Sequence, residues 1–149
     1  MKIGINCWAW GSHFSNEEYL ALIGRAKSLG AELVEICIED DREIDTQAIG
    51  KALRDEGLGC SIVGVFGPHL DVSSEDAGIR GGAVDFAEHC IGLSARLGTD
   101  VFTGAVAGVG GKEVLSDAGR RTRLDHAAEG LRRIGDLGSA AACASGSRS

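Results

Sequence analysis

Hydrophobic and polar positions alternate in blocks along the chain. Four short, apolar runs rich in β-branched residues predict buried strands, at 2–8, 32–38, 60–66 and 100–106. Four longer segments carry apolar residues every three or four positions and predict amphipathic helices, at 15–30, 45–57, 73–98 and 122–138. The chain is therefore predicted to be an α/β protein with the element order βαβαβαβα.

Capping residues mark the ends of the predicted helices. In the first helix, Ser15 or Asn16 is a suitable N-cap, acidic residues follow in the first turn, and Gly30 is a suitable end. The expected inner face of this helix consists of Leu20, Ile23, Ala26 and Leu29. In the fourth helix, the expected apolar stripe consists of Leu124, Ala127, Ala128, Leu131 and Ile134.

Strands that alternate with helices predict a parallel sheet with right-handed crossovers. Two architectures fit this pattern: a small, open, doubly wound sheet, or the first half of a (β/α)8 barrel, which needs about 250 residues in total. In both architectures, functional sites lie at the carboxyl ends of the strands. Candidate functional residues are therefore sought directly after each predicted strand.

The C-terminal segment breaks the regular pattern. Three earlier Leu-Gly pairs are each followed by a strand-like run, but the fourth pair, Leu137-Gly138, is followed only by "SAAACASGSRS". A segment without large apolar residues cannot offset its ordering entropy by burial. We therefore expect a domain over 1–137 and a disordered tail over 138–149. The tail's composition also led to the hypothesis of an out-of-frame translation product that truncates the fold.

Composition and charge narrow the possible functions. The chain has 149 residues, 44% hydrophobic and 25% charged, and a net charge of −7 with no basic block. General affinity for nucleic acid or an anionic membrane is not expected, because both need clustered Lys and Arg. The N-terminus lacks the apolar region of a signal peptide, and the five cysteines form no CxxC pair. A cytoplasmic protein with buried, reduced cysteines is expected, and zinc binding is not.

Several side chains at the predicted strand ends could carry chemistry. Glu35 lies inside the apolar run "LVEICI", so its carboxylate needs either a functional role or a hydrogen-bonding neighbour, and the sequence leaves both open. Trp8, Trp10 and Phe14 could form an aromatic wall for a sugar or merely cover the sheet edge. His13 and His69 lack neighbouring metal-ligand residues.

The glycine-rich segment 104–111 does not fit a nucleotide-binding motif. Val106 stands where the first glycine of a phosphate-binding loop is needed, and Glu113 replaces the Ser or Thr that would bind magnesium. We expect this segment to form a mobile flap over the strand ends.

Five segments carry a resemblance to a known family: "KIGINCWAW", "AKSLGAELVEI", "DEGLGCSIVGVFGP", "DVSSEDAGIRGGAVDFAEHCIGLSARLGTDVFTG" and "LDHAAEGLRRIGDLG". Together they resemble the N-terminal half of the sugar phosphate isomerase/epimerase family. These are xylose isomerase-like TIM barrels that include the ketose 3-epimerases. The resemblance covers residues 1 to about 137. Of the two architectures above, the resemblance implies the first half of a (β/α)8 barrel. It also implies that the ligand of the site is a sugar.

The resemblance also implies which functions this chain carries. In the family, a divalent metal ion, Mn or Mg, is bound by residues of the fifth to eighth strands, and two glutamates there act as acid and base. None of those positions exists in this chain, so no catalytic or metal-binding residue is assigned to it, and no metal is expected to bind it well. The family's substrate pocket is implied for Asn6, Trp8, Phe14, Glu35, Val65 and Ala105.

Three alternatives to an inactive half of a ketose 3-epimerase remain open. The first is a self-associating half-barrel that serves as a binding module, because such a half exposes sheet edges. The second is a different activity within the family, of the inosose dehydratase or hydroxypyruvate isomerase type. The third is a small flavodoxin-like binding domain, although the segment after the first strand does not resemble a phosphate-binding loop.

Overall fold

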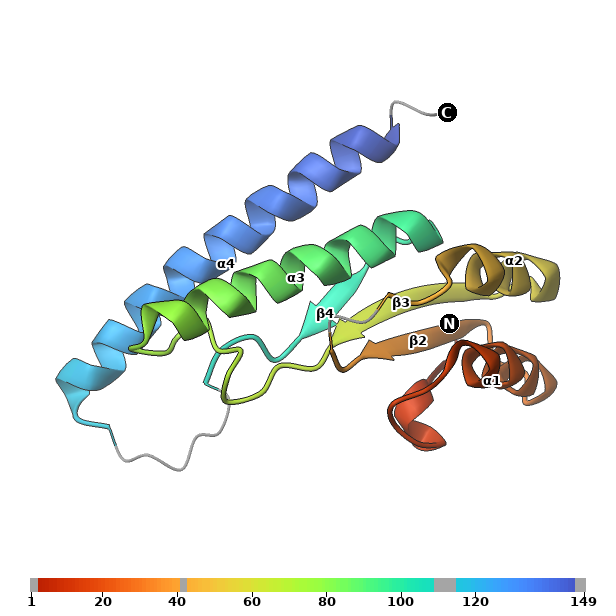
Figure 1. The fold of residues 1–149 in the computed structure, drawn as a ribbon, viewed down its shortest axis with the longest axis horizontal. Helices are drawn as coiled ribbons and strands as arrows, with labels where there is room; N and C mark the ends of the chain where they lie inside the picture. Colours follow the sequence, from red (N-terminus) through yellow and green to blue (C-terminus); the bar gives the residue numbers. More distant parts are fainter. Residues whose placement is uncertain (1–2, 41–42, 109–114, 147–149) are drawn as a thin grey trace.

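The architecture is a parallel sheet alternating with helices (Figure 1). The computed structural model describes residues 3–40, 43–108 and 115–146. Within these ranges the strands are β1 (Gly4–Asn6), β2 (Leu33–Ile38), β3 (Gly59–Gly64) and β4 (Phe102–Gly104). The helices are a short 3-10 turn η1 (Cys7–Ala9), then α1 (Asn16–Ser28), α2 (Thr46–Glu56), α3 (Ala77–Leu97) and α4 (Asp117–Gly146). The predicted order βαβαβαβα is confirmed.

The strand order decides between the two predicted architectures. The sheet runs β1-β2-β3-β4, and each strand pairs in parallel with the next one along the chain. A doubly wound sheet reverses its strand order at a switch point, whereas a (β/α)8 barrel adds each new strand on the same side. The structure is therefore the first half of a (β/α)8 barrel.

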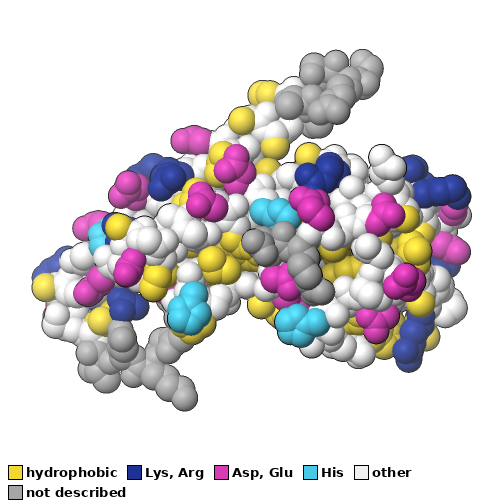
Figure 2. All heavy atoms as spheres, viewed as in Figure 1, with side chains coloured by type: hydrophobic (Ala, Val, Ile, Leu, Met, Phe, Trp, Pro, Cys, Tyr) yellow, Lys and Arg dark blue, Asp and Glu magenta, His cyan; other side chains and the backbone are white. Residues whose placement is uncertain are grey.

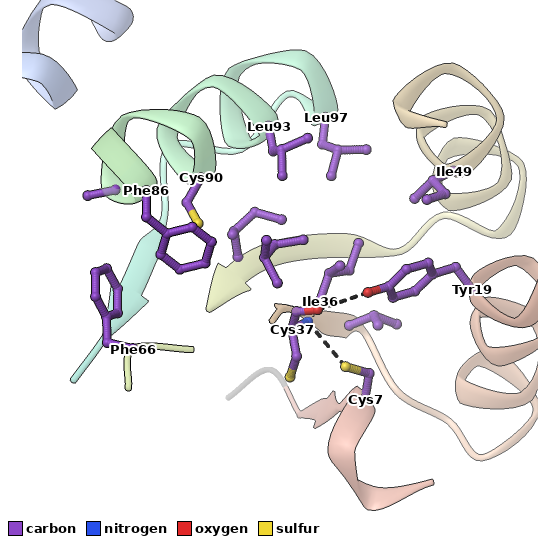
Figure 3. Close-up of a cluster of buried hydrophobic side chains, with 14 of the residues drawn as sticks. Cys7, Tyr19, Ile36, Cys37, Ile49, Phe66, Phe86, Cys90, Leu93 and Leu97 are labelled. Atoms are coloured by element: carbon purple, nitrogen blue, oxygen red, sulfur yellow. Dashed lines mark hydrogen bonds between the residues drawn. The ribbon is translucent and has the colours of Figure 1, made fainter. Parts of the chain in front are cut away.

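The hydrophobic core lies between the sheet and its helices (Figure 3). Along β2, Val34, Ile36 and Ile38 alternate with other residues and are all buried. They join fully buried side chains from the helices and from β3, including Ile23, Ile49, Ile62 and Leu93. Burial of each such side chain contributes about 1.5–3 kcal/mol, which makes this layer the main source of stability.

The opposite face of the sheet carries the more polar residues. In the parallel register, Asn6 lies beside Glu35 and Glu35 lies beside Ser61, while Val63 lies beside Thr103. Residues in register share one face of a sheet. This face corresponds to the interior of the barrel, and it brings Asn6, the last residue of β1, together with Glu35 inside β2.

Helix α1 begins as predicted but buries a partly different face. Ser15 is its N-cap, and a complete capping box joins Ser15 to Glu18. Ile23 and Ala26 are buried as predicted, but Leu20 and Leu29 are 38% and 63% exposed. Their places in the core are taken by Tyr19 and Leu22. The prediction was partly wrong because several arcs of this helix are apolar, and only the position of the sheet selects one.

Helix α4 differs from the prediction at both ends. It begins at Asp117 instead of residue 122, and it continues through Gly138 to Gly146. Residues 138–146 of the expected tail form the last turns of this helix, residues 147–149 lie outside the described ranges, and so do residues 109–111 of the predicted flap. Alanine, which dominates this segment, is the best helix former, and Gly138 does not adopt the positive φ that ends α2 and α3.

The apolar stripe of α4 is only half buried. Ala127 is buried and Ile134 is half-buried, but Leu124 and Leu131 are 63% and 50% exposed. Figure 1 shows α3 and α4 running side by side, and Figure 2 shows hydrophobic side chains at the surface along α4. In the described part of the chain, no helix combines the length and apolar character that a membrane span requires.

Candidate functional site

Asn6, the last residue of β1, connects this strand to the interior of β2. Its side-chain Nδ2 donates to Glu35 Oε2 at 2.6 Å, and both residues are half-buried. Its Oδ1 accepts from the backbone N–H of Trp8 at 2.8 Å, which caps η1, and from the Cys37 thiol at 3.3 Å. Asn6 thus provides the hydrogen-bonding neighbour that the sequence required for Glu35. It fixes the carboxylate on the barrel-interior face of the sheet, beside the end of β1.

Glu39, directly after β2, organises the segment between η1 and α1. Its Oε1 accepts from Trp8 Nε1 at 2.9 Å and from the His13 backbone N–H at 3.1 Å. Its Oε2 lies 3.0 Å from His13 Nε2, and the Glu39 side chain is only 10% exposed. His13 has a φ of 55°, which is uncommon for a residue other than glycine. These contacts hold the loop in that conformation against the strand end.

A pocket of about 260 Å³ opens beside this loop. Phe14 and Tyr19 form an aromatic side of it, with ring centroids 5.4 Å apart. The Tyr19 hydroxyl donates to the Cys37 carbonyl oxygen at 2.8 Å, which fixes the ring against β2. Carboxylates from Glu17, Glu39 and Glu43 line the rest. The pocket therefore combines an apolar wall with hydrogen-bond acceptors, as a polyhydroxy ligand needs.

A second hydrogen-bonded cluster joins the loops that follow β3 and β4. Asp71 Oδ1 accepts from the backbone N–H and the hydroxyl of Ser73, at 2.8 Å and 2.6 Å, and from the Gly108 N–H at 3.2 Å. Asp71 and Ser73 are 3% and 4% exposed. Val65 lies half-buried after β3, where its N–H donates to the Ile38 carbonyl at 2.8 Å. Ala105 is exposed after β4.

The structure brings some of the predicted site residues into contact and leaves others apart. Asn6, Trp8 and Glu35 are joined through the Asn6 side chain, and Phe14 lines the neighbouring pocket. Val65 and Ala105 lie at the ends of the next two strands. Trp10 is half-buried beneath Arg25, whose guanidinium carbon lies 5.3 Å from the ring centroid, so this aromatic residue packs instead of lining the pocket.

Two further acidic residues organise the site. Glu39 belongs to the acidic run 39–41, which the sequence marks as a candidate because it follows a predicted strand, but its three contacts depend on the folded loop. Asp71 gave no signal beyond its place in a polar loop. Among the residues the structure describes, no group of three or more His, Cys, Asp or Glu could hold a metal ion. The residues described here do not fit the family's metal, and no step is assigned to one.

A half-barrel with polar side chains gathered at its strand ends defines a class of parallel α/β barrel proteins with a site at the carboxyl face. Comparison with known proteins agrees with this class. The family model for the xylose isomerase-like TIM barrel matches residues 23–142. The chain therefore belongs to the xylose isomerase-like TIM barrel family.

Individual relatives narrow the likeness to sugar epimerases. A ketose 3-epimerase from Arthrobacter globiformis is 29% identical over 106 residues, which are 71% of this chain and 37% of that protein. The structure of an L-ribulose 3-epimerase superposes with a TM-score of 0.83 at 24% identity, over 94% of this chain and 46% of that one. A D-allulose 3-epimerase from Methylomonas sp., solved with D-allulose, gives a TM-score of 0.78 at 19% identity, over 93% of this chain and 47% of that one. The chain thus spans less than half the length of these relatives.

Proposed function

We propose that this chain is the substrate-binding half of a sugar epimerase or isomerase that acts on ketoses. The observation that carries the proposal is the Asn6–Glu35 pair, joined at 2.6 Å on the barrel-interior face of the sheet, in a chain of the xylose isomerase-like family. The likeness to a ketose 3-epimerase supports the choice of sugar class.

Each candidate residue has a role that suits a sugar. Glu35 can accept hydrogen bonds from sugar hydroxyls, and Asn6 keeps its carboxylate in place. Trp8 and Phe14 offer ring faces to the C–H surface of a sugar, while Val65 and Ala105, after β3 and β4, would contact the sugar from the next two strands. We propose that the groups that move the proton, and the divalent Mn or Mg ion of the family, belong to the remainder of the barrel. By itself, the chain would then bind sugar without turnover.

Complementation tests this division of labour. The chain is mixed with the C-terminal half of the Arthrobacter globiformis ketose 3-epimerase and a manganese salt, and incorporation of solvent deuterium into D-allulose is followed by mass spectrometry. We expect no incorporation with the chain alone and measurable incorporation with both halves. Deuterium incorporation by the chain alone would overturn the proposed inactivity.

A matched pair of variants tests the assigned carboxylate. Glu35→Gln alters the carboxylate inside β2 that Asn6 holds, whereas Glu32→Gln alters an exposed carboxylate just before the same strand. D-allulose binding to the isolated chain is measured by titration calorimetry. We expect the Glu35 variant to weaken binding by about tenfold, since a hydrogen bond to a charged group is worth about 1.5–3 kcal/mol. The Glu32 variant should bind like the parent, and equal affinities of all three proteins would refute the assignment.

A self-associating half-barrel is the second candidate function. Within the described ranges, β1 and β4 are the edges of the sheet, and Leu124 and Leu131 are exposed on α4. Unpaired strand edges and exposed apolar side chains favour association. Size-exclusion chromatography with light scattering should then show a discrete dimer that Leu131→Glu dissociates. A monomer at micromolar concentration would exclude this candidate.

A further inference from the structure

Two buried cysteines lie against each other at the start of the site. Cys7 is the first residue of η1 and Cys37 lies in β2, and they are 0% and 2% exposed. The Cys37 backbone N–H donates to Cys7 Sγ at 3.1 Å (Figure 3). Cys7 Sγ therefore lies in direct contact with the backbone of Cys37, so the two cysteines are neighbours in space although 30 residues separate them in the sequence.

The surroundings of the two thiols give them different reactivities. The interaction between the two side chains lowers the pKa of Cys7 below its usual value, whereas the same interaction and burial raise the pKa of Cys37. The thiolate is the nucleophilic form of cysteine. Cys7 is thus the residue prepared to react first, and Cys37 is the neighbour placed to react with its product. Burial alone raises the pKa of Cys90 to about 12, so that cysteine is a natural comparison.

We propose that Cys7 and Cys37 are a modification site, which a small hydroperoxide converts to a reversible intramolecular disulfide. The Cys7 thiolate attacks one peroxide oxygen, the O–O bond breaks, and the departing hydroxide takes a proton to become water. The Cys37 sulfur then attacks the sulfenic acid on Cys7, giving up its proton as the S–O bond breaks and a second water leaves. The two sulfurs together lose two electrons, and these reduce the peroxide.

The pocket beside the site reaches Cys37, and Cys7 Sγ lies behind it, 3.1 Å from the Cys37 backbone nitrogen. Cys37 is one of the residues that line the cavity of about 260 Å³ next to Phe14 and Tyr19. A hydroperoxide is small enough for such an opening, whereas a protein thiol is not. In a reducing compartment, disulfides are usually transient and redox-sensing, which agrees with a reversible bond here.

The disulfide would change the hydrogen bonds of the candidate site. The Cys37 thiol donates to Asn6 Oδ1 at 3.3 Å, and oxidation removes that donor. Asn6 also caps η1 through Trp8 and holds Glu35, so its side chain transmits the change to the strand ends. Formation of the disulfide does not depend on the proposed function. Only the effect of the disulfide on sugar binding rests on the proposed function.

Peptide mapping of the whole chain tests the proposal. The reduced protein is treated with one equivalent of hydrogen peroxide, blocked with N-ethylmaleimide and digested with trypsin, which releases Cys7 in peptide 3–25 and Cys37 in peptide 28–42. We expect these peptides to be cross-linked, with a mass two hydrogens below their sum, and to separate on addition of dithiothreitol. Recovery of both peptides as maleimide adducts, or cross-linking of Cys7 to another cysteine, would overturn the proposal.

Two variants and one spectroscopic measurement sharpen the test. Cys37→Ser should stop the reaction at a sulfenic acid on Cys7 that dimedone captures, whereas Cys143→Ser, which removes an exposed thiol, should leave the cross-link unchanged. If Cys37→Ser does not fold, the peptide map of the parent protein still shows whether Cys7 and Cys37 form a disulfide. The Asn6 side-chain amide resonances should shift between the reduced and oxidised proteins. Unchanged resonances in a cross-linked protein would refute the coupling to the site, whatever the outcome for sugar binding.

Discussion

Gly130 on α4 provides a direct test of how this helix packs. A Cβ atom added at Gly130 would lie 2.6 Å from Val72 Cβ and 3.0 Å from its Cγ1. Ordinary carbon–carbon contacts are about 3.5–4.0 Å. Val72 is fully buried, and its backbone N–H donates to the Val106 carbonyl at 3.0 Å, so it cannot move away easily. Gly130→Ala should therefore force the helix and the loop apart.

Gly135 on the same helix is the matched control, because a Cβ there meets nothing within 4 Å. Replacing a helical glycine with alanine gains about 0.8–1.0 kcal/mol from propensity, and overpacking costs about 1–3 kcal/mol. Gly135→Ala should thus stabilise the chain by about 1 kcal/mol, while Gly130→Ala should be neutral or destabilising by up to about 2 kcal/mol.

Urea unfolding followed by circular dichroism measures both free energies of unfolding. The difference between the two variants is the informative quantity, because the propensity gain cancels and leaves the clash of about 1–3 kcal/mol. Adding Val72→Ala to the Gly130→Ala protein should recover part of the loss, as expected for residues in contact. If the two alanine variants are equally stabilised, α4 does not pack on Val72 and this account of its position is wrong.

Other substitutions test the core, a helix end and a buried thiol. Ile49→Ala, at a fully buried position, should lower the free energy of unfolding by about 2–5 kcal/mol, whereas Leu124→Ala, at an exposed position, should change it by less than about 0.5 kcal/mol. Urea titrations measure both values, and equal losses of stability would contradict the burial pattern. Gly57→Ala, at a C-cap with a φ of 64°, should cost about 1–2 kcal/mol in the same assay, and an unchanged midpoint would argue against the left-handed conformation. Burial raises the pKa of Cys90 from 9.0 to about 12, so its neutral form stabilises the fold below pH 9 and this contribution is lost as the pH rises toward 12. Guanidinium unfolding at several pH values should show that the free energy of unfolding falls more steeply at alkaline pH for the parent than for Cys90→Ala. Parallel pH profiles of the two proteins would refute the raised pKa of Cys90.

Local features of the fold could be predicted because they depend on neighbouring residues. The alternation of apolar runs with helical spacing predicted all four strands and all four α-helices of the described ranges, but not the short 3-10 helix η1. Ser15 was identified as a possible N-cap because its side chain needs only the backbone three residues later. The C-terminal end of α4 was not predicted, since a Leu-Gly pair ends a helix only when the glycine adopts a positive φ.

The candidate site was predictable only in part. Glu35 was singled out because a carboxylate in an apolar strand needs a partner, and the partner proved to be Asn6, 29 residues away. Glu39 was one of several acidic residues after a strand, and nothing in the sequence showed that His13 and Trp8 would fold back onto it. Hydrogen bonds between distant residues depend on strand register and loop conformation, which have no local sequence signal.

The sequence by itself determined the type and order of the elements, together with the positions where polar residues follow strands. Those properties arise from periodic burial and from local capping, which act over a few residues. Only the tertiary structure decided that the strands add in the order β1-β2-β3-β4, that α1 buries Tyr19 instead of Leu20, and that Cys7 lies against Cys37. The physical reason is that these features follow from how the elements pack in space, and several arrangements satisfy the same hydrophobic pattern.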